Sequence, residues 1–132
     1  MIRPVFGLPL HKSRQMLRDH LESSEYPWAD QHLDYLDTAV VFICVDGEYI
    51  AGYMWFFLLE EDNGIWTIHA SWDEKYRKKW AYRSVMNTIF AVCYSLGCNH
   101  ILAESHHNDL LVRMGAEMTD DGAMLKLPYI WR

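Results

Sequence analysis

The 132-residue sequence is short of cysteine, of positive charge and of long hydrophobic runs. Its three cysteines, Cys44, Cys93 and Cys98, have no metal-like spacing. Cys44 stands in an apolar run and Cys93 on a predicted helix, which indicates free, buried thiols in a reducing compartment. The longest apolar run, Tyr53 to Leu59, is far too short to cross a bilayer. We therefore expect neither a disulfide framework nor a membrane-spanning helix.

The N-terminus and the charge balance narrow the class of protein further. The first residues lack a long apolar run and are broken by Pro4 and Pro9, so no signal peptide is expected. There are 12 Lys and Arg against 18 Asp and Glu, a formal net charge of −6, which argues against general nucleic-acid binding. A local basic patch stays compatible with that balance. The hydrophobic fraction of 51% is ample for one core, so residues 1–132 are predicted to form a single domain.

Hydrophobic periodicity and turn residues predict the element order β-α-(α)-β-β-β-α-β-α-β-β. Pro4 requires an edge position for the first strand, and Asp46-Gly47 is the strongest hairpin signal. This order predicts an α+β fold: a mixed, mostly antiparallel sheet with helices on both faces. The expected strands are Ile2 to Phe6, Ala39 to Val45, Glu48 to Leu59, Ile65 to Trp72, His100 to Ala103, Ala116 to Thr119 and Ala123 to Leu127. The expected helices are Leu10 to Leu21, Lys75 to Leu96 and Asp109 to Met114, with a loop or short helix around Trp28 to Leu36.

The start of the long predicted helix is unusually basic. Lys75, Arg77, Lys78 and Lys79 stand there, although the positive end of the helix dipole favours anions. Cations at this end are explained by a phosphate or another polyanion in front of the helix. A solvated charged face, a nucleic acid or an acidic partner protein are the alternatives.

Two other stretches have competing interpretations. The run His106-His107-Asn108-Asp109 resembles a metal cluster, but adjacent histidines converge poorly and no ligand pattern completes it, so no metal is predicted. Asn108 or Asp109 is better explained as a helix cap. The aromatic strand after Gly47 is apolar on both faces, which indicates burial between helices or, if one face is exposed, a partner or self-association surface.

The chain resembles the GCN5-related N-acetyltransferase (GNAT) family over nearly its whole length. The motif from Tyr76 to Tyr82, YRKKWAY, stands where that family carries its acyl-CoA pyrophosphate loop. The segment Ser95-Leu96-Gly97 before a short strand is similar to the family's helix end and fifth strand, and His106 to Glu117 is similar to its last short helix. The resemblance implies the GNAT fold and an acetyl-CoA site. The residues implied to bind the cofactor are Arg77, Lys78, Lys79, Trp80, Ala81, Tyr82 and Arg83.

Two features depart from the family pattern. Trp80 and Tyr82 replace loop glycines that let backbone N–H groups approach a pyrophosphate. Leu111 stands where the family has its tyrosine general acid, and it cannot donate a proton. The scaffold is therefore expected with an altered cofactor loop and an altered acid position.

The resemblance also suggests two candidate bases. His69 lies on the strand before the long helix, where acetyltransferases often keep a base, and histidine titrates in the range that this work requires. Thr67 and Ser71 are expected on the same strand face, which could open to a cleft. Glu104 on the next strand is the second candidate. For both, a purely structural, hydrogen-bonded role is the competing explanation.

Within the family, the pattern Met114-Gly115-Ala116-Glu117 followed by Asp120-Asp121-Gly122 looks most like short GNAT-like proteins of tailed phages, some of them assigned to virion interiors or head assembly. Two hypotheses follow. In the first, a phage GNAT-like protein works as a virion or assembly component through protein contacts or as a homo-oligomer. In the second, the chain is an active acetyl-CoA-dependent N-acetyltransferase acting on a small amine or a protein amine. The expected location is the bacterial host cytoplasm or a phage virion, with no membrane and no nucleic-acid partner.

Overall fold

The computed structural model describes residues 2–5, 10–24, 26, 28–60, 63–76, 83–104 and 108–132. Its elements follow the predicted order. The strands are β1 (Ile2–Val5), β2 (Val40–Asp46), β3 (Tyr49–Glu60), β4 (Ile65–Trp72), β5 (His100–Ala103), β6 (Glu117–Thr119) and β7 (Gly122–Lys126). The helices are α1 (Leu10–Ser23), α2 (Ala29–Leu33), α3 (Arg83–Ser95) and α4 (Asn108–Arg113), with 3-10 turns η1 (Leu36–Thr38) and η2 (Glu74–Tyr76).

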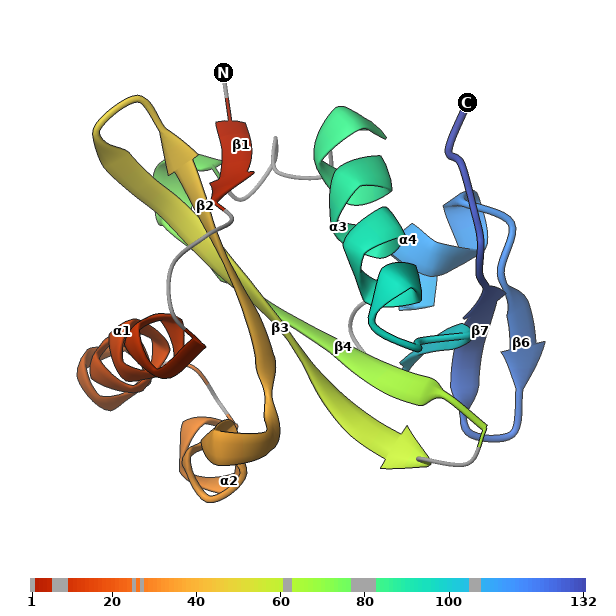
Figure 1. The fold of residues 1–132 in the computed structure, drawn as a ribbon, viewed down its shortest axis with the longest axis horizontal. Coiled ribbons are helices and arrows are strands. Elements are labelled where there is room, and N and C mark those ends of the chain that lie inside the picture. Colours follow the sequence, from red (N-terminus) through yellow and green to blue (C-terminus); the bar gives the residue numbers. More distant parts are fainter. Residues whose placement is uncertain are drawn as a thin grey trace.

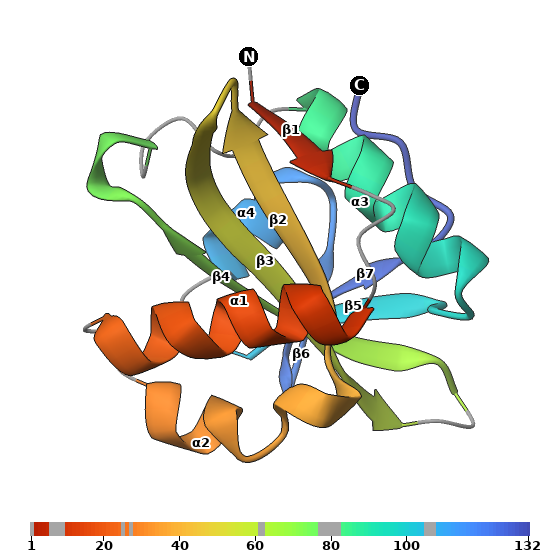
Figure 2. The same cartoon turned by 60° about the vertical axis from the view of Figure 1, so that its left-hand side comes forward.

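The strands form one seven-stranded sheet in the order β1-β2-β3-β4-β5-β7-β6 (Figures 1 and 2). Every neighbouring pair is antiparallel except β4 and β5, which are parallel. The connection between those two strands runs through α3, as a parallel crossover requires. Pro4 lies in β1 at one edge of the sheet, where its missing N–H is tolerated, so the edge prediction is confirmed.

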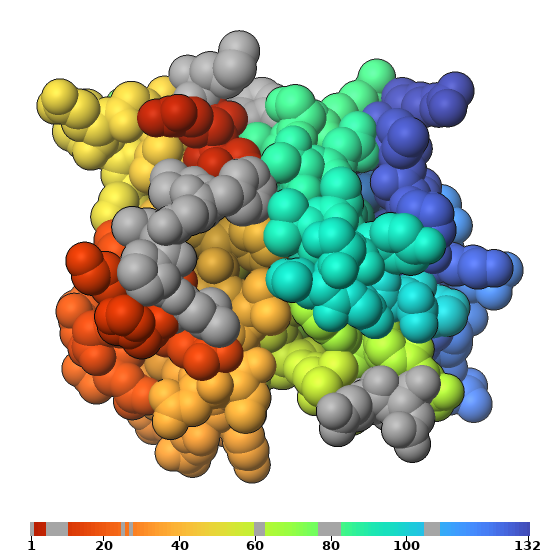
Figure 3. All heavy atoms as spheres, in the orientation of Figure 1, coloured from red at the N-terminus to blue at the C-terminus, as the bar shows by residue number. Residues whose placement is uncertain are grey.

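Two hydrophobic clusters cover the two faces of the sheet. Leu17 and Leu21 of α1 pack with Trp55 of β3 on one face, and Ile89 and Phe90 of α3 pack on the other. Alternate residues of β3 enter alternate clusters, because side chains along a strand point to opposite faces. In the space-filling view, the N-terminal elements, red to yellow, and the C-terminal elements, cyan to blue, cover opposite halves of the visible surface (Figure 3).

Burial on both faces is thus the correct explanation for the aromatic middle of β3. Met54, Trp55 and Phe56 are fully buried. At the two ends of the strand, Tyr49 and Leu59 are exposed.

The long helix does not include Lys75. This residue lies in η2, and the described part of α3 is Arg83–Ser95, so the prediction that Lys75 stands in the first turn of the helix was wrong. The Asp73 carboxylate accepts a hydrogen bond from the Lys75 backbone N–H at 3.1 Å, and the Asp73 carbonyl accepts one from the Tyr76 N–H at 2.8 Å. Such local bonds favour a turn over a helix. The Tyr76 hydroxyl also donates to Asp46 at 2.9 Å, which ties η2 to the end of β2.

The three cysteines are buried, free thiols, as predicted. Burial raises the pKa of Cys44 to about 12 and that of Cys98 to about 12, and it also raises the pKa of Cys93. A thiol held protonated in this way is a poor nucleophile. The cysteines are therefore core residues.

The hairpin between β6 and β7 depends on a glycine. Gly122 has φ +135°, and a Cβ atom built on it would clash with the Ala103 carbonyl oxygen. Gly47 also has a positive φ, but its Cβ would meet nothing within 4 Å.

We expect Gly122→Ala to lower the free energy of unfolding by about 3–4 kcal/mol, the sum of backbone strain and overpacking. Gly47→Ala, which adds strain alone, should cost about 1–2 kcal/mol in the same urea titration. Equal losses would contradict the close approach.

The attachment of α1 to the sheet should depend on pH. His20 contacts Ser71 Oγ through Nε2 at 2.8 Å, and burial lowers the pKa of His20 below the ordinary 6.5. As the pH falls past about 6.5, the unfolded chain takes up this proton before the folded chain does, so the free energy of unfolding decreases. His20→Gln keeps a polar partner for Ser71 and does not titrate. It should show a shallower loss of stability between about pH 7.5 and 5.5. Identical slopes for the two proteins would contradict the lowered pKa.

Candidate active site

The parallel strands β4 and β5 stay together over a short distance. Their registered pairs are Ile65 with His100, Trp66 with Ile101 and Thr67 with Leu102. Beyond Thr67, β4 continues beside β3 to Trp72, while β5 follows β7. The sheet therefore divides beyond Thr67 of β4, near the carboxyl end of β5.

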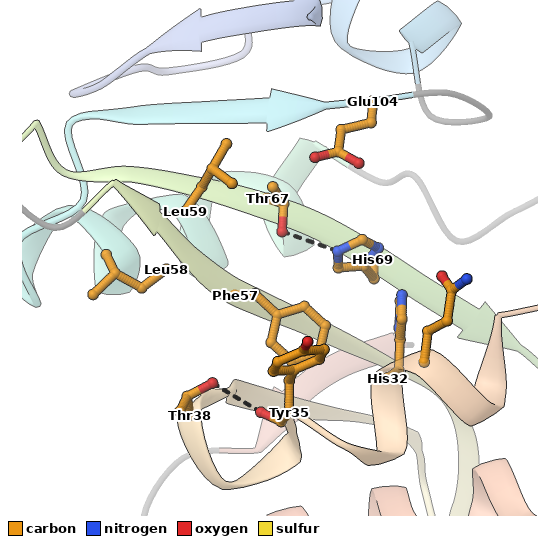
Figure 4. Close-up of a pocket in the computed structure, with 10 residues that line it drawn as sticks. His32, Tyr35, Thr38, Phe57, Leu58, Leu59, Thr67, His69 and Glu104 are labelled. Atoms are coloured by element: carbon orange, nitrogen blue, oxygen red, sulfur yellow. Dashed lines mark hydrogen bonds between the residues drawn. The ribbon is translucent and has the colours of Figure 1, made fainter.

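A cavity of about 290 Å³ lies at this division, on the face covered by α2 and η1 (Figure 4). Strands β3 and β4 and the residue that follows β5 form one wall, and α2 with η1 forms the other. The lining residues are Gln31, His32, Tyr35, Thr38, Phe57, Leu58, Leu59, Thr67, His69 and Glu104. Both candidate bases identified in the sequence, His69 and Glu104, are among them. The fold thus brings together two residues that stand far apart in the chain.

His69 is held on several sides. Its Nε2 lies 3.0 Å from Thr67 Oγ1, and Thr67 is buried, with 5% of its surface exposed. Its ring stacks over Trp55 at a centroid distance of 6.0 Å and contacts Phe57 at 5.3 Å. The predicted shared face of Thr67 and His69 is confirmed. The imidazole is therefore oriented by one polar and two aromatic neighbours, while its role as a base stays a prediction.

His32 of α2 is the part of the site that sequence reasoning missed. The Trp55 indole N–H donates to His32 Nδ1 at 2.9 Å, and the His32 and His69 ring centroids lie 4.3 Å apart. Because an indole nitrogen only donates, Nδ1 of His32 carries no proton and a neutral His32 has its proton on Nε2. Only the polar stretch around Trp28 to Leu36 hinted at His32, and nothing local reveals a bond to a residue 23 positions away.

Glu104 supplies the acidic side chain of the cavity. It follows β5 directly and is exposed. In Figure 4 its carboxylate turns toward Thr67 and His69 across the division between the strands. A carboxylate and an imidazole facing one space can hold a cation and accept a proton from it.

The predicted cofactor residues are mostly outside the described part of the chain. Arg77, Lys78, Lys79, Trp80, Ala81 and Tyr82 all fall there, as do His106 and His107 of the run that resembles a metal cluster. Arg83 is described; it is exposed, begins α3 and does not line the cavity. Leu111, at the family's acid position, is fully buried in the core.

Among the described residues, no group of three or more His, Cys, Asp or Glu side chains is placed to hold a metal ion. Within the same ranges, no helix has the length and apolar character needed to cross a membrane.

The bond between Trp55 and His32 predicts a defined tautomer. In ¹⁵N NMR spectra near pH 8, His32 should show a protonated Nε2 and an unprotonated Nδ1. Trp55→Phe removes the donor and should give a mixture of tautomers, with a loss of about 1–3 kcal/mol in stability. Trp66→Phe, on the opposite face of the sheet, is the matched control and should leave the His32 tautomer unchanged. A proton on Nδ1 in the unmodified protein would contradict the hydrogen bond.

No family model and no curated protein sequence matches this chain. Solved structures do. A protein assigned to the GNAT acetyltransferases from Desulfovibrio desulfuricans aligns over 96% of this chain and 98% of its own, with 14% identity and a TM-score of 0.63. An N-acetyltransferase of the GNAT family from Escherichia coli, in complex with CoA, aligns over 94% of this chain and 78% of its own, with 19% identity and a TM-score of 0.60.

A third neighbour, assigned as an acetyltransferase, comes from Salmonella typhimurium and was solved with its cofactor acetyl-CoA. It aligns over 96% of this chain and 93% of its own, with 14% identity and a TM-score of 0.59. At these identities the likeness concerns the fold. The chain has the α+β fold of the GNAT acyltransferases, as the sequence predicts.

Proposed function

We propose that this chain is an acetyl-CoA-dependent N-acetyltransferase whose active site is the cavity between β4 and β5. The observation that carries the proposal is the meeting of His69 and Glu104 where the two parallel strands part. The GNAT fold, and structural neighbours solved with CoA and acetyl-CoA, support it. Because one fold can serve many functions, the proposal depends on the residues of the site.

The described residues fit an acyl-CoA at this place. Beyond Thr67, no residue of the described β5 pairs with β4, so this stretch of β4 lacks a neighbouring strand on that side. An extended chain with amide groups, such as the arm of CoA, can add to a strand edge of this kind. The phosphates of the cofactor would be held by Arg83 together with Arg77, Lys78 and Lys79. Trp80 and Tyr82 would have to leave room where the family has glycines.

Two side chains of the cavity, those of Glu104 and His69, could bind the substrate ammonium and remove its proton. Glu104 would hold the substrate ammonium by a charge-assisted hydrogen bond. His69 would take the proton that the nitrogen must lose before it can react, and Thr67 keeps the imidazole in place. When bound, acetyl-CoA supplies an acetyl group activated as a thioester; with an alkylammonium the products are the N-acetyl amine, the CoA thiol and one proton. Because a thiol has an ordinary pKa of about 8.5, its release needs no strong side-chain acid at Leu111.

The virion or head-assembly hypothesis has no support among the structural neighbours described above. We therefore place it second to the enzyme. A homo-oligomer or a protein partner is compatible with either function and stays a prediction.

Binding and turnover test the proposal together. At about 100 times its dissociation constant, acetyl-CoA should raise the free energy of unfolding by about 2.7 kcal/mol. His69→Gln should keep this stabilisation but lower kcat/KM by about 10²–10⁴-fold. His11→Gln, at an exposed histidine of α1 outside the cavity, is the matched control and should retain full activity. The absence of any stabilisation at millimolar acetyl-CoA would refute the enzyme.

A further inference from the structure

The cavity between β4 and β5 has one acidic lining residue, Glu104, and several apolar ones. This combination indicates which kind of amine the site accepts as the acetyl acceptor. Resting on the proposed acetyltransferase function, we infer that the acceptor is a small primary amine with a compact aryl or branched alkyl substituent and no anionic group.

The polar end of the cavity matches one ammonium. Glu104 is the one acidic side chain among the described lining residues, and it stands beside Thr67 and His69. No lysine or arginine is among these lining residues. A substrate carboxylate or phosphate would thus meet no lysine or arginine among the described lining residues, and it would face the Glu104 carboxylate at close range. This argues against amino acids and phosphorylated amines as acceptors.

The remaining lining of the cavity is largely apolar and partly exposed. Leu58 is 45% exposed, Leu59 51% and Tyr35 63%, and the Tyr35 ring meets the Phe57 ring edge-on at a centroid distance of 6.4 Å. Large apolar side chains left exposed around a cavity are typical of a binding surface that a ligand covers. An aryl or branched alkyl group would cover them.

The size of the cavity agrees with a small acceptor. Its volume of about 290 Å³ lies at the lower end of the range for small-molecule sites. That space accommodates one ring or branched chain beside the reacting groups. Glu104 would select the charge, and Leu58 and Leu59 would select the substituent.

Calorimetric titration of the full chain, without acetyl-CoA, tests this selectivity directly. The probe is 2-phenylethylamine. Of its comparison ligands, 2-phenylethanol lacks the charge, phenylalanine adds a carboxylate, and spermidine replaces the ring by an extended, charged chain. We expect 2-phenylethylamine to bind at least about tenfold more tightly than each comparison ligand.

Variants of the lining residues test whether the ligand selectivity comes from the cavity. Glu104→Gln should remove the preference for 2-phenylethylamine over 2-phenylethanol, and Leu59→Asn should weaken both ligands to a similar extent. Glu117→Gln, at an exposed glutamate of β6 outside the cavity, should change neither affinity. The thermal unfolding midpoint of each variant verifies that it is folded.

Binding of phenylalanine or spermidine as tightly as 2-phenylethylamine would overturn the inference, and so would an unchanged preference in Glu104→Gln. The two proposals fail in different ways. If acetyl-CoA binds and is turned over with spermidine or an amino acid, the enzyme stands and the acceptor class is wrong. If 2-phenylethylamine binds with the expected preferences and acetyl-CoA neither binds nor reacts, the cavity selectivity stands and the acetyltransferase is refuted.

Discussion

The division of the sheet after Thr67 is the constraint on which the site depends. Because β4 stays with β3 and β5 stays with β7, the two parallel strands separate beyond Thr67. The cluster under α3 makes this arrangement stable, since it includes Ile68 of β4 and Ile101 of β5 and so spans the division. The separation leaves a cavity whose wall is made of regular strands. Side chains on such strands are held more precisely than side chains on loops, which suits a site that must position an amine.

A layer of aromatic rings beneath the cavity connects the fold to its chemistry. Trp55 is fully buried, donates to His32 and lies under His69. One residue thus fixes the proton position of the first histidine and supports the ring of the second. His32 lies in the short helix α2, so the indole bond also helps to hold the outer wall of the cavity. In this way the burial that stabilises β3 also organises the candidate active site.

Much of the architecture could be predicted from local patterns. The turn at Asp46-Gly47, the alternation along β3 and the edge position demanded by Pro4 are properties of short segments, and the structure has them. The start of α3 was predicted wrongly, because η2 ends in a buried tyrosine bonded to Asp46, a contact 30 positions away. Likewise, His69 and Glu104 could be singled out by position in the fold, but their meeting in one cavity, and the part played by His32, depend on long-range packing that no local pattern contains.

The central claim is that the division between β4 and β5 is where acetyl-CoA and the amine meet. Backbone and side-chain NMR spectra recorded during a titration with acetyl-CoA test it most directly. The account predicts the largest shift changes along β4 beyond Thr67, at the His69 ring and at Glu104, with smaller changes in α1. Saturable changes confined to other surfaces, with β4 and His69 unaffected, would contradict it.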